Sequence, residues 1–272
     1  MRIKLDSHPW IRCGAEPMVT MDVLHLWETV TRRSFDRALK AGIYPDAINN
    51  ATKSYIQQIV ELMGPDAPIL CHKQPHTFIY LKLLGNLFPQ AKFVHLIRDG
   101  RGAVASSMSR NLCNHKPSQC LSEWQKTTTK MIQDCADLGP NRCIQVRYEI
   151  LVLHTEQEMR RVLGKSERMS AFLQIPWDPI VLHHEDLKNN LTGLNPYEPS
   201  TKQFLLPVHN KSLNAWSEVS SPIPVNVQKK TCDDWKLLKL LDYCPSIGYI
   251  PQYENIPWDI PSLESIRSLN QK

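Results

Sequence analysis

Residues 92–110, which read KFVHLIRDGRGAVASSMSR, decide the fold of this chain. Phe93–Ile97 form an apolar run, and Asp99-Gly100 breaks that run at a tight turn. After the turn, apolar and small residues return at helical spacing, at Ala103, Val104, Ser107 and Met108. The stretch therefore predicts a buried strand that feeds a helix, which is the repeating unit of a parallel α/β sheet flanked by helices.

Three polar side chains of the same stretch form a candidate anion site. Arg98 stands at the carboxyl end of the predicted strand, where open α/β sheets bind ligands. Ser106 and Arg110 are four residues apart, so they share one face of the helix. Two guanidiniums and a hydroxyl can hold a phosphate. A capped helix with solvated arginines is the alternative, and this short stretch alone does not decide between them.

Composition places the chain among globular proteins. It has 272 residues, of which 42% are hydrophobic and 22% charged. No apolar run reaches the length of a membrane span, and the first ten residues, MRIKLDSHPW, lack the apolar core of a signal peptide. The formal net charge is +5, but the basic residues are scattered, so nucleic-acid binding is not expected.

Working outward, helices and strands are expected to alternate on both sides of residues 92–110. The expected helices cover roughly 21–39, 46–63, 77–88, 120–138, 155–173 and 222–241, and the other strands cover 68–73 and 143–148. Residues 188–211 are expected to form a long loop. Residues 1–241 are expected to be one domain, and residues 242–272 a loose C-terminal tail.

Several motifs occur in a fixed order from about Met1 to Trp216. They are RCGAE (12–16), CHKQP (71–75), RDGR (98–101), RYEILVLH (147–154), IPW (175–177), VLHHEDL (181–187), and PST (199–201) followed by LPV and Trp216. Together they resemble the protein-tyrosine sulfotransferases. The resemblance implies an α/β fold related to P-loop kinases. It also implies a secretory-pathway enzyme that moves a sulfuryl group from 3′-phosphoadenosine 5′-phosphosulfate to tyrosine in acidic peptides.

The resemblance assigns catalytic roles to Glu16, Lys73 and Ser200. Glu16 would be the general base, a role for which a carboxylate is suited if burial raises its pKa. Lys73 would stabilise charge on the sulfuryl group, and Ser200 would donate a hydrogen bond near the leaving group. From the residues alone, Glu16 is a residue at a helix start, Lys73 a solvated lysine and Ser200 an ordinary loop serine.

The resemblance also implies a cofactor site and two disulfides. Residues matching the family's cofactor contacts are Arg98, Ser106, Arg110, Tyr148, Ser200, Thr201 and Gln203. The first three would hold the 3′-phosphate, and Tyr148 would contact the nucleotide. The implied disulfides are Cys13–Cys71 and Cys135–Cys143. The other four cysteines have no assigned partner, although a Cys232–Cys244 bridge is an open alternative.

The chain also departs from the family pattern. Met1-Arg2 aligns with the end of a block that reads PRSGTT and then LMR in the family. The first strand, the 5′-phosphosulfate loop and the usual membrane anchor are therefore expected to be missing from the chain as written. The family's basic TRIIPR segment is replaced by residues 17–22, PMVTMD, which puts a preference for acidic peptides in doubt. Leu206 and Ala215 replace lysines, and about seven residues around Gly164–Met169 look inserted.

Three functions follow from these observations. The first is tyrosine sulfation in the Golgi lumen or at its membrane, without a metal ion, by an enzyme of a family that is often dimeric. The second is a catalytically inactive protein of the same fold that binds nucleotide or peptide. The third, a small-molecule sulfotransferase, is disfavoured because that class commonly uses a catalytic histidine. His183–Asp186 lack the spacing of a helical zinc site, and the sequons at Asn50, Asn190 and Asn210 favour a glycoprotein.

Overall fold

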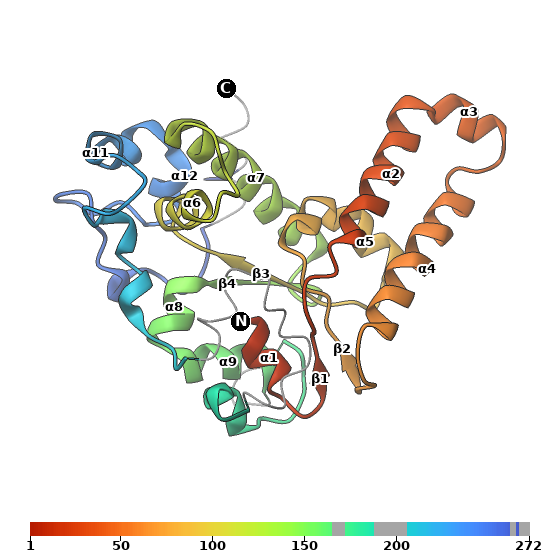
Figure 1. Cartoon of the computed structure of the whole chain (residues 1–272), viewed down its shortest axis with the longest axis horizontal. Coiled ribbons are helices and arrows are strands. Elements are labelled where there is room, and N and C mark those ends of the chain that lie inside the picture. Colours follow the sequence, from red (N-terminus) through yellow and green to blue (C-terminus); the bar gives the residue numbers. More distant parts are fainter. Residues whose placement is uncertain (165–171, 188–205, 262–264, 267–272) are drawn as a thin grey trace. The chain divides into compact units, whose positions relative to one another are not determined.

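The computed structural model describes four parts of the chain: residues 1–164, 172–187, 206–261 and 265–266. Helices predominate, and the strands pair in parallel (Figure 1). The expected α/β class is therefore confirmed. The chain folds as two compact units, one made of Met1–Ala91 with Asp178–Pro207, and the other of Lys92–Trp177 with Val208–Lys272.

The first unit pairs two short strands beside a helical hairpin. Its elements are α1 (Arg2–Asp6), β1 (Ile11–Arg12), α2 (Val19–Arg33), α3 (Phe35–Lys40), α4 (Asp46–Leu62), β2 (Ile69–Leu70), the 3-10 turn η1 (Pro75–Tyr80), α5 (Leu81–Leu87), η2 (Pro179–Leu182) and η3 (His184–Leu187). β1 and β2 are parallel, with Ile11 opposite Ile69. The single helix expected over residues 21–39 is divided at Ser34, whose φ of −123° interrupts the helical backbone.

The second unit is built on a longer parallel pair of strands. Its elements are β3 (Phe93–Ile97), α6 (Gly100–Ser109), α7 (Pro117–Leu138), β4 (Cys143–Arg147), α8 (Tyr148–Leu153), α9 (Thr155–Leu163), η4 (Asn210–Ser212), η5 (Ala215–Ser217), α11 (Val225–Asp234), α12 (Lys236–Leu240) and η6 (Tyr253–Asn255). β3 and β4 pair along their whole length, from Phe93 opposite Cys143 to Ile97 opposite Arg147. The helix expected over 155–173 ends at Leu163, and residues 165–171 lie outside the described residues.

The strand–helix unit predicted at residues 92–110 is present as β3 and α6. Asp99 caps α6, because its side chain accepts a hydrogen bond from the Arg101 backbone N–H at 2.9 Å. Gly100 is required at the turn, since a Cβ there would lie 2.5 Å from the Trp124 ring of α7. The turn between strand and helix is therefore fixed both by its cap and by close packing.

The C-terminal segment belongs to the core, and the expectation of a loose tail is wrong. Tyr243 and Tyr253 are fully buried, and Ile256 is buried in the same apolar cluster as Ile97 and Trp216. The tyrosine hydroxyls are satisfied inside the protein, by Glu149 at 2.8 Å and by the Asp99 side chain at 2.9 Å respectively. The prediction was based on the proline-rich and polar composition of residues 242–272, which does not reveal that a few of their aromatic side chains are buried.

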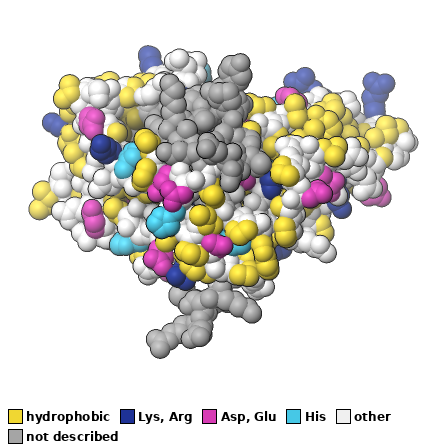
Figure 2. All heavy atoms as spheres, turned by 60° about the horizontal axis from the view of Figure 1, so that its bottom comes forward, with side chains coloured by type: hydrophobic (Ala, Val, Ile, Leu, Met, Phe, Trp, Pro, Cys, Tyr) yellow, Lys and Arg dark blue, Asp and Glu magenta, His cyan; other side chains and the backbone are white. Residues whose placement is uncertain are grey.

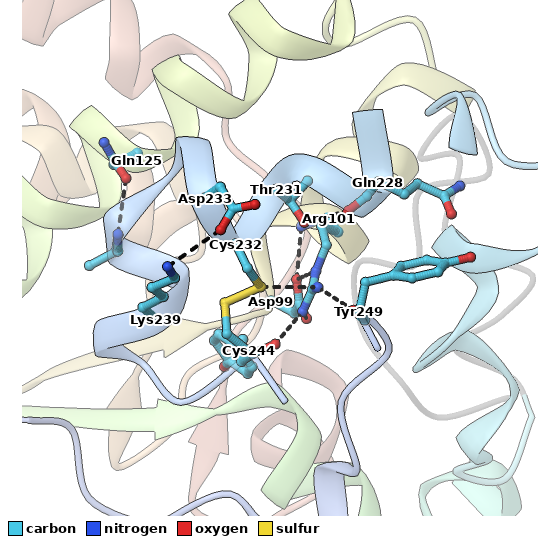
Figure 3. The surroundings of a disulfide bond; sticks show 12 residues. Asp99, Arg101, Gln125, Gln228, Thr231, Cys232, Asp233, Lys239, Cys244 and Tyr249 are labelled. Carbon is cyan, nitrogen blue, oxygen red and sulfur yellow. Dashed lines mark hydrogen bonds and ion pairs between the residues drawn. A yellow bond between two sulfur atoms is a disulfide. The ribbon is translucent and has the colours of Figure 1, made fainter. Parts of the chain in front are cut away.

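Arg101 links this C-terminal segment to α6. Its guanidinium forms two bonds to the Asp99 carboxylate, at 2.6 and 2.9 Å, and donates to the carbonyls of Tyr243 and Tyr249. It also lies over the Trp216 ring, 4.2 Å from the centroid. Figure 3 shows the same side chain against the Cys232–Cys244 disulfide. Arg101 is therefore a buried structural residue.

All eight cysteines form disulfides. The two pairs implied by the resemblance, Cys13–Cys71 and Cys135–Cys143, are present. Two further pairs join Cys113 to Cys120 and Cys232 to Cys244. The four cysteines for which the resemblance implied no partner are therefore also paired, and Cys232–Cys244 is one of these two bridges.

Glu149 makes stability depend on pH. Burial raises its pKa from 4.5 to about 7, the nearby Asp99 carboxylate adds to the rise, and the Asp99 N–H and the Tyr243 hydroxyl partly offset it. Between these values the folded protein binds more protons than the unfolded chain, so this group's contribution falls as pH rises from 4.5 to 7, by about 3 kcal/mol. Urea denaturation of Glu149→Gln and the parent chain across this range should show the parent losing stability relative to the variant as pH rises. If the difference in free energy of unfolding between the parent and Glu149→Gln did not change with pH, Glu149 would not be the titrating group.

Candidate active site

Glu16 and Lys73 meet at one edge of the β1–β2 pair. Lys73 follows β2 by three residues and Glu16 follows β1 by four, and the two strands are parallel. Both residues therefore leave the strands at their carboxyl ends, where α/β folds place ligand-binding groups. The Lys73 ammonium forms an ion pair with Glu16 Oε1, and each side chain is about a quarter exposed, at 26% and 25%. The structure thus brings together the predicted base and the predicted cation.

The loop that carries Glu16 is held by α1. Asp6 Oδ1 accepts the Cys13 backbone N–H at 2.7 Å, and Arg2 donates to the Gly14 carbonyl. Gly14 has φ +64°, a left-handed conformation that favours glycine, so the sequence RCGAE suits the sharp turn before Glu16. These bonds fix the backbone that presents the carboxylate.

Two further links tie the Glu16 side to the Lys73 side. The Cys13–Cys71 disulfide joins the residues that directly follow β1 and β2. Thr20, fully buried at the start of α2, hydrogen-bonds through its hydroxyl to His72 Nε2 at 3.0 Å. Burial lowers the pKa of His72 to about 4, so the ring is neutral at physiological pH and adds no charge beside Lys73. The segments that carry Glu16 and Lys73 are therefore joined by the Cys13–Cys71 disulfide and by the Thr20–His72 hydrogen bond.

Removing the Cys13–Cys71 disulfide is expected to destabilise the protein more than removing Cys135–Cys143. The sequence separations are 58 and 8, so the chain-entropy model gives losses of roughly 4 and about 2.5 kcal/mol. Denaturant unfolding of the two double alanine variants would measure both losses. Equal losses, or the opposite order, would show that loop closure does not dominate.

The candidate phosphate residues lie in and around α6: Ser106 is within the helix, Arg110 directly follows it, and Arg98 precedes it by two residues. Arg98 directly follows β3, and its side chain runs beside Gly102, where an added Cβ would lie 3.0 Å from the guanidinium Nε. Gly102, Ser106 and Arg110 are successive i, i+4 positions, so they continue the same face of the helix. The three residues predicted to bind phosphate, Arg98, Ser106 and Arg110, are partly buried. The second unit thus places the Arg98 guanidinium beside Gly102, with Ser106 and Arg110 four and eight residues after that glycine.

Tyr148 is placed against Arg98. The Arg98 guanidinium lies 4.5 Å from the centroid of the Tyr148 ring and donates to the Ser212 carbonyl at 2.8 Å. The Tyr148 hydroxyl shares a 2.7 Å hydrogen bond with the Ser212 hydroxyl. The contact of Ser212 was not predicted, because nothing in a polar loop indicates that a hydroxyl reaches the start of a helix more than sixty residues earlier in the chain. The sequence signals in that segment, the sequon at Asn210 and the LPV…Trp216 motif, did not indicate a contact with Tyr148.

The remaining positions that the sequence analysis singled out are not part of either group of residues described above. Ser200, Thr201 and Gln203 lie outside the described residues. Leu206 and Ala215 are exposed. In the VLHHEDL motif, His184 contacts the Glu185 carboxylate and the Leu206 carbonyl, at 3.3 and 3.1 Å. Among the described residues, no three His, Cys, Asp or Glu side chains gather as a metal site would require.

Basic, acidic and apolar side chains are interspersed on the surface shown in Figure 2. On the face drawn in Figure 2, outside the grey atoms, Lys and Arg are scattered among apolar and acidic side chains. Within the described part of the chain, each helix is too short or too polar to traverse a bilayer.

Comparison with known proteins gives the family. The model described as "Sulfotransferase family" matches residues 1–179. Protein-tyrosine sulfotransferase A of Caenorhabditis elegans is 36% identical over 254 residues, which is 90% of this chain and 64% of that protein. Protein-tyrosine sulfotransferase 1 of Danio rerio is 34% identical over 257 residues, covering 90% and 68%. A putative protein-tyrosine sulfotransferase of C. elegans is 31% identical over 264 residues, covering 95% and 96%.

Solved structures agree on the fold. The sulfotransferase domain from the curacin biosynthetic pathway matches with a TM-score of 0.53 at 16% identity, covering 88% of this chain and 92% of that domain. The sulfotransferase domain of the Synechococcus PCC 7002 olefin synthase matches with a TM-score of 0.51 at 18% identity, covering 88% of each chain. This chain spans 64% and 49% of the length of the first two curated relatives, from C. elegans and Drosophila melanogaster. The chain therefore belongs to the sulfotransferase family, and its relatives place it with the protein-tyrosine sulfotransferases.

Proposed function

We propose that this protein transfers a sulfuryl group from 3′-phosphoadenosine 5′-phosphosulfate to tyrosine hydroxyls of secretory-pathway polypeptides. The observation that carries the proposal is the contact between Glu16 and Lys73 at the carboxyl edge of β1 and β2. Relatives whose names include protein-tyrosine sulfotransferase support the reaction class. The two groups differ in charge and chemistry, as a base and an electrostatic stabiliser must.

Glu16 would act as the general base. Its carboxylate accepts the phenolic proton while the tyrosine oxygen forms a bond to sulfur. The bond from sulfur to the donor's phosphate oxygen breaks, and 3′,5′-ADP leaves with that electron pair. Lys73 would exchange its ion pair with Glu16 for the reacting sulfuryl oxygens and stabilise their charge. The ion pair also keeps both groups ordered before substrates bind.

Residues of the second unit would hold the donor's nucleotide. Arg98 and Arg110 supply the guanidiniums that suit a 3′-phosphate, and Ser106 supplies a hydroxyl between them. Tyr148 would contact the nucleotide through its ring or hydroxyl. The residues present fit this role because Arg98 lies beside Gly102, and Ser106 and Arg110 follow that glycine at steps of four residues. By the resemblance, Ser200, Thr201 and Gln203 would add further contacts.

Four disulfides and exposed sequons support a secretory location. Disulfides persist in oxidising compartments. Asn50 on α4 and Asn210 at the start of η4 are exposed, as glycosylation acceptors must be, and Asn190 lies outside the described residues. The proposed compartment is the Golgi lumen.

Two assays on the full-length protein test the proposal. Calorimetry should detect binding of 3′,5′-ADP, and a sulfation assay should detect transfer from the donor to a tyrosine peptide. Binding without transfer would favour the inactive-binder alternative. Absence of both would overturn the proposal.

The acceptor preference is expected to differ from a preference for acidic peptides. Beside Glu16, Met18 is 61% and Val19 40% exposed, and Asp22 is exposed on the first turn of α2. These side chains form an apolar and acidic surface. Such a surface favours acceptor peptides with neutral residues beside the tyrosine and repels peptides with acidic residues there. Peptides with neutral flanks should therefore be sulfated at least as fast as peptides with acidic flanks.

The paired substitution Met18→Arg/Asp22→Arg tests this surface. It should raise the rate with the acidic peptide by about tenfold, which corresponds to roughly 1.4 kcal/mol of added attraction. Asp36→Arg on α3 makes a charge change of the same sign away from Glu16 in the sequence and serves as the control. A parent protein that strongly prefers the acidic peptide would refute the expectation.

A further inference from the structure

Ser212 is bonded to two of the residues that form the proposed nucleotide site. Its backbone carbonyl accepts a hydrogen bond from Arg98 Nη2 at 2.8 Å, and its hydroxyl lies 2.7 Å from the Tyr148 hydroxyl. Arg98 itself lies over the Tyr148 ring. The three residues therefore form a closed set of contacts, in which each touches the other two. They come from three separate segments: the end of β3, the start of α8, and η4.

This arrangement restricts both side chains. A guanidinium has five N–H donors in one plane, so the bond to the Ser212 carbonyl restricts its orientation and leaves other donors for a bidentate contact with phosphate. Tyr148 is fixed at its far end by the Ser212 hydroxyl and covered on one face by Arg98. Close approach to Gly102 limits Arg98 on the side of α6. A phosphate bound here would meet a guanidinium already held in place, which lowers the entropic cost of binding.

We propose that Ser212 is a positioning residue for the nucleotide end of the sulfuryl donor. It acts through Arg98 and Tyr148 and holds them as one rigid platform for the 3′-phosphate. The inference rests on the proposed function, because the ligand is the nucleotide of that reaction. It adds a residue that is not among the predicted site residues and that comes from η4, three positions before Ala215.

The role makes a specific kinetic prediction. Ser212→Ala removes the hydroxyl and keeps the carbonyl. Because Ser212 also completes the sequon at Asn210, parent and variants are all compared in an Asn210→Gln background, in which the bond to Tyr148 is the contact that is lost. The dissociation constant of 3′,5′-ADP should rise about fivefold, the effect of one neutral hydrogen bond. The KM for the donor should rise to a similar extent, whereas kcat and the melting temperature should stay close to those of the parent. Ser212→Thr keeps a hydroxyl and should restore binding.

Calorimetry with 3′,5′-ADP on the full-length protein tests the inference through a double-mutant cycle. Ser212→Ala and Tyr148→Phe each remove one end of the same bond, so the double variant should bind no more weakly than the weaker of the two single variants. Ser217→Ala is the matched control, because that hydroxyl bonds only to the Asn214 carbonyl among the described contacts, in the next turn of the same segment. It should bind like the parent.

The outcomes separate the inference from the function. If the parent binds 3′,5′-ADP and Ser212→Ala binds as tightly as Ser217→Ala, the inference fails and the proposed function stands. Additive losses in the double variant also reject it, because the two hydroxyls would then act independently. A parent that does not bind 3′,5′-ADP rejects both.

Discussion

Replacement of Glu16 by glutamine is expected to lower the rate of tyrosine sulfation by about 10²- to 10⁴-fold, the usual contribution of a general base. Glutamine keeps the shape and can still accept a hydrogen bond from Lys73, but it cannot take the phenolic proton. Binding of 3′,5′-ADP should not change, because the residues proposed to hold the nucleotide are elsewhere in the sequence. Steady-state rates with a tyrosine peptide, together with calorimetry, would measure both effects.

Glu61→Gln is the matched control for this substitution. Glu61 is an exposed carboxylate of α4, hydrogen-bonded to Gln57 at 2.8 Å, and the same chemical change there should leave the rate unaltered. An equal loss in both variants would point to a general effect on the fold. An unimpaired Glu16→Gln protein would remove Glu16 from the mechanism.

Replacement of Arg101 by methionine is expected to lower the free energy of unfolding by about 3–5 kcal/mol. Arg101 and Asp99 have side-chain exposures of 0% and 1%, so the substitution leaves a buried carboxylate without its cation. It also removes the bonds to the Tyr243 and Tyr249 carbonyls that attach the C-terminal segment. Denaturant unfolding would measure the loss.

A surface pair supplies the comparison for Arg101. Arg32 pairs with Glu28 at 3.1 Å on α2, with a side chain that is 78% exposed, so Arg32→Met should cost only about 0–1 kcal/mol. The double variant Asp99→Asn/Arg101→Met should be more stable than the Arg101→Met variant, because no buried charge is then unpaired. A loss of less than 1 kcal/mol in Arg101→Met would show that the buried network contributes little.

Local patterns predicted the strand–helix unit, but they did not predict how Arg101 is used. The apolar run before Asp99-Gly100 and the helical spacing after it were enough to identify β3 and α6. In contrast, RDGR suggests solvated arginines, and Arg101 is buried by residues more than a hundred positions away. Such burial depends on tertiary contacts that periodicity does not encode.

The same limit applies to the C-terminal segment and the additional disulfides. A few aromatic residues, Tyr243 and Tyr253 among them, decide that this segment is core, although its average composition resembles a loop. Cysteine pairing cannot be derived from spacing, and the resemblance covered only Cys13–Cys71 and Cys135–Cys143. The motifs implied catalytic roles for Glu16 and Lys73 but not the ion pair between them, whose geometry requires β1 and β2 to be parallel neighbours.

Transfer of radiolabelled sulfate tests the central claim most directly. The full-length protein is incubated with labelled 3′-phosphoadenosine 5′-phosphosulfate and with two peptides that differ only by tyrosine or phenylalanine at one position. We expect label on the tyrosine peptide alone, and near-complete loss of that label with the Glu16→Gln protein. A parent protein that binds 3′,5′-ADP but labels neither peptide, or a Glu16→Gln protein that labels the tyrosine peptide at the parent rate, would contradict it.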